Sequence, residues 1–345
     1  MEIRLTRLTI RRRRALRISR GVSGTTENLF VEVRAGGIAG IGEAAPVGYR
    51  DPQDAESAER EIGAAAPSLA SLQPCQMSAV EALLKEGGVR SAARAAINIA
   101  CYDWLGKRAG LPVYRLLGLE PKAPPTSVTV GINTPEVVAE ETARILAETG
   151  GRVLKVKLGG EGGIEADKER FLAARGAVPD GAALRVDANG AWGVSDAVLM
   201  IAWLAEQGCE YVEQPISHEA DDELPHIYEK RRLPILLDES VWTAHDAARL
   251  GRLCDGVNVK LMKCGGISEA LRIVHTVKAM GLKTMIGCFG ESSLAISAGA
   301  AISALFDYVD LDSHLNLDPD PAEGAEMVDG GPRPRDLPGI GVRMR

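Results

Sequence analysis

The sequence predicts an α/β protein in which a barrel of alternating strands and helices follows a smaller α+β unit. Three observations support this prediction. Residues 1–47 have strand signals, whereas the alanine-rich stretch from Ala55 to about Arg108 has helical spacing. A proline-rich segment, residues 121–125, then interrupts the chain. Beyond it, short apolar runs alternate with helical stretches, which is the pattern of parallel βα units.

The first unit is predicted to be a small sheet followed by helices. Leu29–Val33 is an apolar strand, and the loop Val47–Gln53 is expected to expose Gly48, Tyr49 and Arg50. Gly110 and Pro112 end the last helix. We place this α+β capping domain at residues 1–120. The tail 315–345, which is rich in proline, glycine and aspartate, is expected to pack back onto it and complete it.

The barrel is predicted at residues 126–314. Its eight apolar runs are Ser127–Ile132, Val153–Leu158, Ala183–Ala188, Glu210–Glu213, Ile235–Asp238, Gly256–Leu261, Leu282–Cys288 and Phe306–Asp312. The helical segments between them include Pro135–Ala147, Ile164–Val178, Val194–Glu206, Ala244–Leu253 and Ser268–Met280. Eight strands at this pitch favour a (β/α)8-type barrel. A doubly wound open sheet is disfavoured because no Gly-x-Gly-x-x-Gly fingerprint follows any strand.

Composition limits the classes of function. The chain has 345 residues, 46% hydrophobic content and a net charge of −7, so a nucleic-acid partner is not expected. The run Arg11–Arg14 is interpreted as a solvated strand or turn. No signal peptide or membrane-spanning stretch is predicted. The six cysteines lack metal-site spacing, which favours free thiols in a cytoplasmic protein. The sequence does not specify an oligomeric state, so a homo-oligomer remains open.

The strand Val153–Leu158 carries two lysines, Lys155 and Lys157, between glycines on both sides. Alternation along a strand directs both lysines to one face. Burial and the like charge of a neighbour both disfavour protonation, so we expect a depressed lysine pKa and a base near neutrality. The alternative is a lysine that snorkels from the end of a strand.

Three carboxylates follow the next three strands. Asp187, Glu213 and Asp238 are separated by 26 and 25 residues, about one βα unit each. Because catalytic groups of such barrels lie at the carboxyl ends of the strands, these side chains are expected to converge. Converging carboxylates repel one another unless they share a cation, and oxygen ligands suit Mg²⁺. Each could otherwise cap the helix that follows it.

The later strands add charged residues at the same edge. Lys260 ends the sixth strand, four strands after Lys157 and so opposite it in an eight-stranded ring; Lys263 is expected to be solvated or structural. Asp310 and Asp312 share one face after the eighth strand and could bind a substrate ammonium group, or could form a turn.

These residues resemble the muconate-lactonising subgroup of the enolase superfamily. The Lys-x-Lys pair, the carboxylate series and Lys260 before Lys263-Cys264-Gly265-Gly266 match its barrel motifs. Gly42–Pro46 and Asp103–Lys107 resemble its first domain. The pair Asp310-Leu311-Asp312 is similar to the dipeptide epimerases, such as L-Ala-D/L-Glu epimerase. The resemblance covers essentially the whole chain.

The resemblance implies a modified (β/α)7β barrel with an α+β capping domain, and one Mg²⁺ per subunit on Asp187, Glu213 and Asp238. It implies that Lys155 assists the substrate carboxylate and that Lys157 and Lys260 act on opposite faces of the α-carbon, giving 1,1-proton transfer through an enediolate. Asp310 and Asp312 would hold the ammonium group of a dipeptide. Thr129 and Cys288 are expected to line the site.

Other functions remain open at this stage. N-acylamino-acid racemisation, o-succinylbenzoate synthesis or muconate-type cycloisomerisation would use the same lysines and metal, but their substrates lack the ammonium group. A Schiff-base aldolase or a non-catalytic binding protein are the alternatives from other classes. In the cap loops, Arg20 or Arg50 could face an acidic substrate side chain or be solvated, and Phe289 and Gly290 could shape the pocket.

Overall fold

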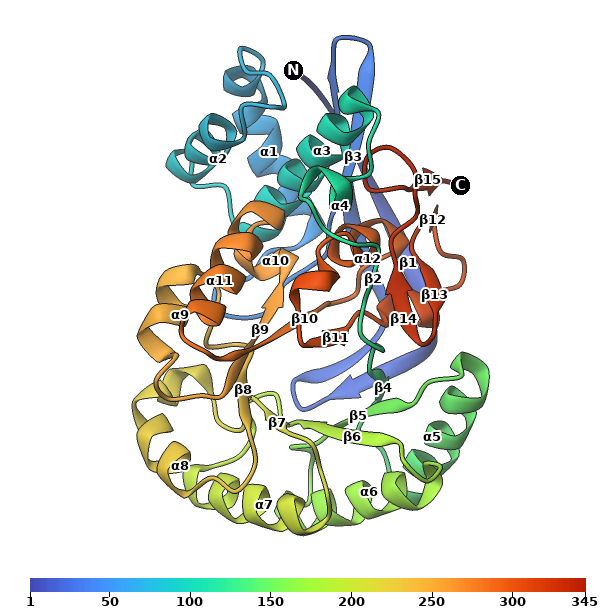
Figure 1. Ribbon diagram of the computed structural model, residues 1–345, viewed down its shortest axis with the longest axis vertical. Helices are drawn as coiled ribbons and strands as arrows, with labels where there is room; N and C mark the ends of the chain where they lie inside the picture. The colour runs from blue at the N-terminus through green and yellow to red at the C-terminus, as the bar shows by residue number, and fades with distance from the viewer.

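The computed structural model describes residues 1–345. The N-terminal unit is a three-stranded antiparallel sheet, in the order β1-β2-β3, with helices packed against it (Figure 1). A Cβ atom at Gly40 of β3 would lie 2.0 Å from the carbonyl oxygen of Ala100, so only glycine lets the sheet approach α3 this closely. The elements are β1 (Glu2–Ile18), β2 (Gly21–Ala35), β3 (Ile38–Ala44), α1 (Ala55–Leu69), α2 (Met77–Glu86), α3 (Ser91–Ala109) and α4 (Val113–Leu116).

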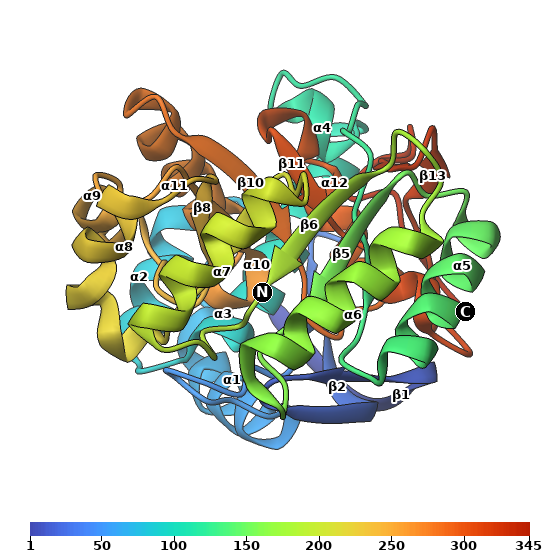
Figure 2. The same ribbon diagram turned by 90° about the horizontal axis from the view of Figure 1, so that it is seen from below.

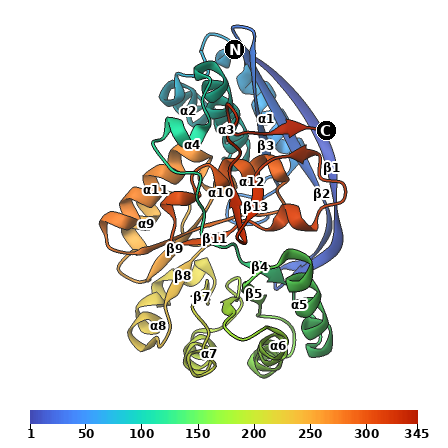
Figure 3. The same ribbon diagram turned by 45° about the vertical axis from the view of Figure 1, so that its right-hand side comes forward.

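Strands β1 and β2 form a long hairpin that reaches from the cap to the barrel, as Figure 3 shows from the side. The pairing register shifts between Arg11 and Leu16, and such irregularities bend and twist a hairpin. Beyond the shift, the carbonyl of Arg17 accepts a hydrogen bond from the backbone N–H of Ile132 at 2.8 Å. The tip of the hairpin is therefore attached to the carboxyl end of the first barrel strand.

The second unit is a parallel barrel, and all eight predicted strands are present. Neighbouring strands pair in chain order, and a backbone bridge between Thr126 and Val309 joins the first strand to the last. The strands are β4 (Val128–Val130), β5 (Val153–Lys157), β6 (Ala183–Asp187), β7 (Val212–Glu213), β8 (Ile235–Leu237), β9 (Gly256–Lys260), β10 (Lys283–Gly287) and β11 (Tyr308–Asp310).

Helices surround the barrel (Figure 2). The five predicted helical segments correspond to α5 (Pro135–Thr149), α6 (Gly163–Ala177), α7 (Val194–Glu206), α9 (Ala244–Leu250) and α11 (Ile267–Ala279). Three further α-helices are α8 (Leu224–Lys230), α10 (Leu261–Cys264) and α12 (Ser293–Ala300), with 3₁₀ turns at His218–Glu223, Ser303–Leu305 and Ser313–Asn316. Because β11 has no α-helix after it, the architecture is the expected (β/α)7β barrel with an α+β cap.

The C-terminal tail forms two short hairpin-like pairs, β12 (Ala322–Glu323) with β15 (Arg343–Met344) and β13 (Glu326–Val328) with β14 (Gly331–Arg333). Gly339 accepts a hydrogen bond from the N–H of Val113 at 2.8 Å in the cap. Ser297 of α12, in the barrel, accepts one from the N–H of Ala325 at 2.7 Å. The tail therefore contacts both units, and the domain limits 1–120, 126–314 and 315–345 stay a prediction.

Candidate active site

The three predicted carboxylates meet at the carboxyl ends of neighbouring strands. Asp187 on β6 lies in register with Glu213 on β7, and Asp238 directly follows β8. One oxygen of each lies within 4.8 Å of the others, and all three side chains are fully buried. Three converging carboxylates fit a Mg²⁺ ion, which prefers oxygen ligands and leaves room for substrate oxygens.

Two residues with strained backbones hold this carboxylate group in place. Asn189 has φ 45° and Gln214 has φ 36°, which is rare for residues other than glycine. The N–H of Asn189 donates to Asp187 Oδ1 at 2.8 Å, and Gln214 Oε1 accepts from the N–H of Asp238 at 2.9 Å. Strain of this kind persists where surrounding contacts enforce it, often at functional sites. Neither Asn189 nor Gln214 was predicted as a site residue from the sequence.

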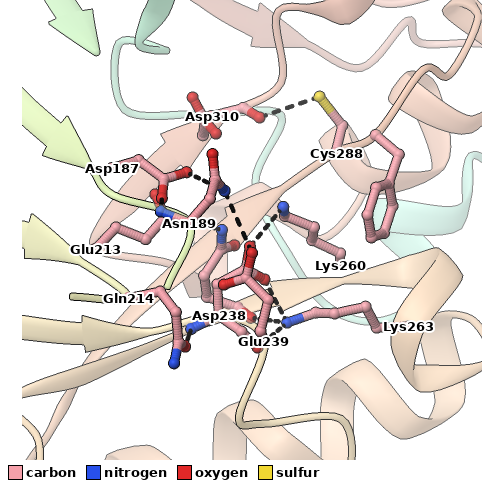
Figure 4. Close-up of polar contacts among 12 residues, drawn as sticks. Asp187, Asn189, Glu213, Gln214, Asp238, Glu239, Lys260, Lys263, Cys288 and Asp310 are labelled. Atoms are coloured by element: carbon pink, nitrogen blue, oxygen red, sulfur yellow. Dashed lines mark hydrogen bonds and ion pairs between the residues drawn. The ribbon is translucent and has the colours of Figure 1, made fainter. Parts of the chain in front are cut away.

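The predicted lysines surround the carboxylates. Lys157 Nζ pairs with Asp187. Lys260 Nζ donates to Asp238 Oδ2 at 2.7 Å (Figure 4). Lys155 Nζ pairs with Asp310 and lies 3.4 Å from Glu213 Oε2. Strands β5 and β9 are four apart in the ring, so Lys157 and Lys260 approach from opposite sides. This is the arrangement that the sequence suggested.

The expected direction of the lysine pKa shift is wrong for Lys155. Burial lowers its pKa, but Asp310, Glu213 and Asp187 together outweigh burial and hold the pKa well above its usual value. The pKa of Lys260 is also raised, because Asp238 and Glu213 outweigh burial. Desolvation acts as expected, but carboxylates from strands far along the chain, which the spacing of residues does not reveal, outweigh it.

The same neighbouring charges, together with burial, shift the pKa values of the carboxylates. Burial and the charge of Asp187 raise the pKa of Glu213 to about 8. The pKa of Asp238 is lowered even though burial opposes this, because Lys260 and Lys263 both face it.

Lys263 is buried, so the expectation that it is solvated was wrong and the structural interpretation holds. Its Nζ donates to Asp238 Oδ1 at 2.6 Å and to the carbonyl oxygens of Val241 at 3.0 Å and Asn258 at 2.9 Å. Figure 4 shows Lys260 and Lys263 on one side of Asp238. The pair of lysines fixes both oxygens of that carboxylate.

Asp310 and Asp312 lie at the end of the site that adjoins β4. Asp312 Oδ2 accepts from the N–H of Thr129 at 2.7 Å, and the thiol of Cys288 lies 3.3 Å from the carbonyl oxygen of Asp310. Asp310 Oδ1 is buried and has no hydrogen-bond partner. Burial and the charge of Asp310 raise the pKa of Asp312. Asp310 Oδ1 can therefore still accept a hydrogen bond, and a cationic group of a ligand is suited to donate it.

A cavity of about 470 Å³ lies over these residues, between the barrel and the cap. The three carboxylates expected to bind metal are not among its lining residues. The other site residues predicted from the sequence all line it: Lys155, Lys157, Lys260, Asp310, Asp312, Thr129 and Cys288. Phe289 and Gly290 also line it, as expected. The cap contributes residues of the hairpin and of the 47–53 loop, among them Ile18, Val22 and Tyr49.

The two cap arginines bind the barrel. Arg20 Nη1 donates to Glu239 Oε1 at 2.6 Å and to the carbonyl of Asn189 at 3.0 Å. Arg50 donates to Asp246 Oδ1 at 3.0 Å and to the carbonyl of Ser240 at 3.1 Å. Protein acceptors therefore occupy both guanidinium groups in place of a substrate carboxylate, although 34% of each side chain remains exposed to solvent. Both arginines instead attach the cap loops to the segment that follows Asp238.

Tyr49 is also less exposed than expected, because its ring packs between other groups. The guanidinium of Arg20 lies 4.6 Å from its centroid, and the rings of Trp242 and Phe289 lie 5.8 and 6.0 Å away. Gly48 and Arg50 are exposed as predicted. The cap loop therefore closes the cavity with an aromatic side chain.

The rest of the molecule adds two observations. All six cysteines are free, and none of the helices combines the length and apolarity that a membrane crossing requires.

Comparisons with known proteins cover the full chain. A model of the mandelate racemase / muconate lactonizing enzyme N-terminal domain matches residues 2–118, and an enolase C-terminal domain-like model matches residues 137–345. A hydrophobic dipeptide epimerase of Roseobacter litoralis is 48% identical over 344 residues, 99% of this chain and 98% of that protein. A hydrophobic dipeptide epimerase of a Flavobacteria bacterium is 41% identical over 348 residues, with 100% and 99% coverage. The solved structure of a dipeptide epimerase from Enterococcus faecalis, complexed with Mg and the dipeptide L-Leu-L-Tyr, superposes with a TM-score of 0.93 at 32% identity, covering 99% of this chain and 98% of that one.

Proposed function

Because the chain belongs to the mandelate racemase / muconate lactonizing enzyme family of enolase-like proteins, we propose that it is a magnesium-dependent dipeptide epimerase. One observation carries the proposal: Lys157 and Lys260 come from strands on opposite sides of the barrel and face one cavity, each paired with a different carboxylate of the same group. An α-carbon between them can lose a proton on one face and gain one on the other.

The proton transfer is assigned to the two lysines. One lysine, as the neutral amine, accepts the α-proton at Nζ, and the electron pair of the C–H bond passes into the adjacent carboxylate to form an enediolate. The other lysine, as the ammonium ion, donates a proton to the opposite face. Magnesium on Asp187, Glu213 and Asp238 would supply fixed positive charge that holds the substrate carboxylate and stabilises the charge developing on it. Lys155, which faces Glu213 and Asp310, adds a second positive charge at this carboxylate.

The substrate's amino terminus is assigned to Asp310 and Asp312. Both face the cavity beside Thr129 and Cys288, and Asp310 Oδ1 has no partner within the protein. An ammonium group there would pair with both carboxylates and supply the missing hydrogen bonds. N-acylated amino acids and muconate-type substrates have no such group, so these contacts favour a dipeptide over the alternatives.

The second residue of the dipeptide is proposed to be apolar. Lys260 Nζ lies 4.6 Å from the ring centroid of Phe289, and Tyr49 packs beside that ring, so a side chain on the reacting carbon would contact aromatic surface. Arg20, which could otherwise bind a glutamate side chain, is paired with Glu239. The two hydrophobic dipeptide epimerases at 48% and 41% identity support the same preference.

The test is a mass-shift screen in D₂O. The protein is incubated with Mg²⁺ and pooled L,L-dipeptides, with N-acetylated copies of the same dipeptides as controls. The proposal predicts incorporation of one deuterium, selectively in dipeptides with a free amino terminus and an apolar second residue. Incorporation into the acetylated copies instead would identify an N-acylamino-acid racemase, and incorporation into neither would refute the proposed reaction.

A cytoplasmic location and assembly into a homo-oligomer are also proposals. The six unpaired cysteines support the first, since free thiols are typical of reducing compartments. Sedimentation of the purified protein would settle the second.

A further inference from the structure

Arg12 is a cavity residue that the proposed reaction does not use. It belongs to the run Arg11–Arg14 on β1, where Arg13 Nε donates to the carbonyl of Leu317 and Arg14 pairs with Glu148. Arg11 and Arg13 are exposed, whereas Arg12 and Arg14 point the other way and line the cavity. The expectation of a fully solvated run was therefore wrong for every second residue of it, because the hairpin covers the barrel opening.

The guanidinium of Arg12 has no protein partner. It takes part in no hydrogen bond or ion pair, and its Nε is buried and unsatisfied. A guanidinium carries five N–H donors and a permanent charge, and withdrawing such a group from water without a partner is unfavourable. Because Arg12 lines the cavity and its guanidinium has no protein partner, it is available to donate hydrogen bonds to an acceptor group of a bound ligand.

The position of Arg12 within the cavity identifies which part of the ligand it would meet. A Cβ atom at Gly290 would lie 2.8 Å from Arg12 Nη2, so glycine leaves this space to the guanidinium. Asp312 and the thiol of Cys288 are the charged or titratable groups that act most on Arg12, yet Asp312 forms no ion pair with it and binds the N–H of Thr129. Arg12 therefore lies at the end of the cavity assigned to the substrate's amino terminus.

We propose that Arg12 binds the side-chain carboxylate of an acidic first residue, so that the preferred dipeptides have aspartate or glutamate before the apolar residue. The inference rests on the proposed function. With the ammonium group on Asp310 and Asp312, the first side chain begins one bond from the carbon bearing that group. A carboxylate can accept two parallel N–H hydrogen bonds from a guanidinium. An alkyl side chain on the substrate offers no acceptor, and a lysine in place of Arg12 cannot donate in this paired geometry.

A different role for Arg12 would leave the same structure. It could serve only to balance the charge of Asp310 and Asp312 without touching the substrate. This role predicts a similar effect on every dipeptide, whereas direct binding predicts an effect confined to acidic first residues.

The experiment compares kcat/KM for L-Glu-L-Leu, L-Gln-L-Leu and L-Ala-L-Leu in the wild type, Arg12→Met, Arg12→Lys and the exposed neighbour Arg11→Met. The proposal predicts that the wild type favours the glutamate dipeptide over the glutamine dipeptide by about 10- to 100-fold, the range of a hydrogen bond to a charged group. Arg12→Met should lower kcat/KM for the glutamate dipeptide by about 10-fold or more relative to L-Ala-L-Leu and so lose this preference, and Arg11→Met should retain it. Arg12→Lys should recover only part.

The possible results distinguish the role of Arg12 from the epimerase assignment. Equal loss for all three dipeptides in Arg12→Met, or a wild type without preference for glutamate over glutamine, would overturn the role of Arg12 while leaving the epimerase assignment intact. Absence of any dipeptide turnover by the wild type would overturn both.

Discussion

Replacing the buried lysine that supports Asp238 tests how the site is held together. Lys263 is 1% exposed, and its ammonium group donates to Asp238 Oδ1 at 2.6 Å and to carbonyl oxygens of Asp238, Val241 and Asn258. Methionine has a similar length and no charge, so Lys263→Met preserves much of the packing while it removes every one of these hydrogen bonds.

The magnitude follows from what is left behind. Removing one partner of a buried ion pair destabilises a protein by about 3–5 kcal/mol, because the remaining charge stays desolvated. Here Lys260 still pairs with the other oxygen of Asp238, which reduces the loss. Three backbone carbonyl groups, of Asp238, Val241 and Asn258, lose this donor, which adds to the loss. We therefore expect Lys263→Met to lower the free energy of unfolding by about 3 kcal/mol or more, and to weaken magnesium binding because Asp238 is less firmly fixed.

The assay is urea unfolding of the metal-free protein, with magnesium affinity measured separately by calorimetry. Lys283→Met is the matched control, since Lys283 forms a 3.1 Å pair with Asp307 and its side chain is 57% exposed. Exposed pairs contribute about 0–1 kcal/mol. Should the two variants lose the same small amount of stability, the argument that Lys263 is a structural cation would be refuted.

Three further predictions follow from the same contacts. Asp312→Asn should raise the KM for dipeptides by 10-fold or more with little change in magnesium affinity measured by calorimetry; an equal loss of both would contradict its ammonium role. Burial and Glu43 raise the pKa of Glu291 to about 8, above its unfolded value, so the folded state retains a proton that the unfolded state loses and stability should fall as the pH rises from about 4.5 to 8. Glu291→Gln should remove this pH dependence, which amounts to at most ~5 kcal/mol of unfolding free energy between pH 4.5 and 8 at about 1.36 kcal/mol per pH unit. An unchanged slope in urea titrations would refute the assignment. Arg20→Met leaves Glu239 buried and unpaired and should destabilise the protein, whereas adding Glu239→Gln should restore most of the loss; additive losses in the double variant would refute their coupling.

The barrel and its carboxylate group were predictable because their signals are local. An apolar run that ends in a charged residue marks both a strand and its functional end, and this pattern recurs at Asp187, Glu213 and Asp238. Helix α7 was predicted with its observed limits, since its apolar positions recur with helical spacing. Helix α12 was not predicted, because all eight of its residues are buried and no polar face produces a period.

The electrostatics of the site were less predictable because the partners are distant in the chain. Lys155 is paired with Asp310, 155 residues away, and Lys263 with Asp238, 25 residues away. The environment of the arginines on β1 was equally hard to predict from the sequence. Alternation along β1 gives two faces to the run Arg11–Arg14, but only the folded hairpin shows which face lies over the cavity.

The most direct test of the two-base mechanism measures which epimer each lysine variant deprotonates. Lys157→Ala and Lys260→Ala are incubated separately in D₂O with Mg²⁺ and with the L,L or the L,D form of one good dipeptide substrate. Each variant should bind magnesium and fail to epimerise, and any deuterium exchange should occur in one epimer only, with opposite epimers for the two variants. Epimerisation at a near-wild-type rate by either variant, or exchange of the same epimer by both, would contradict two bases on opposite faces of the α-carbon.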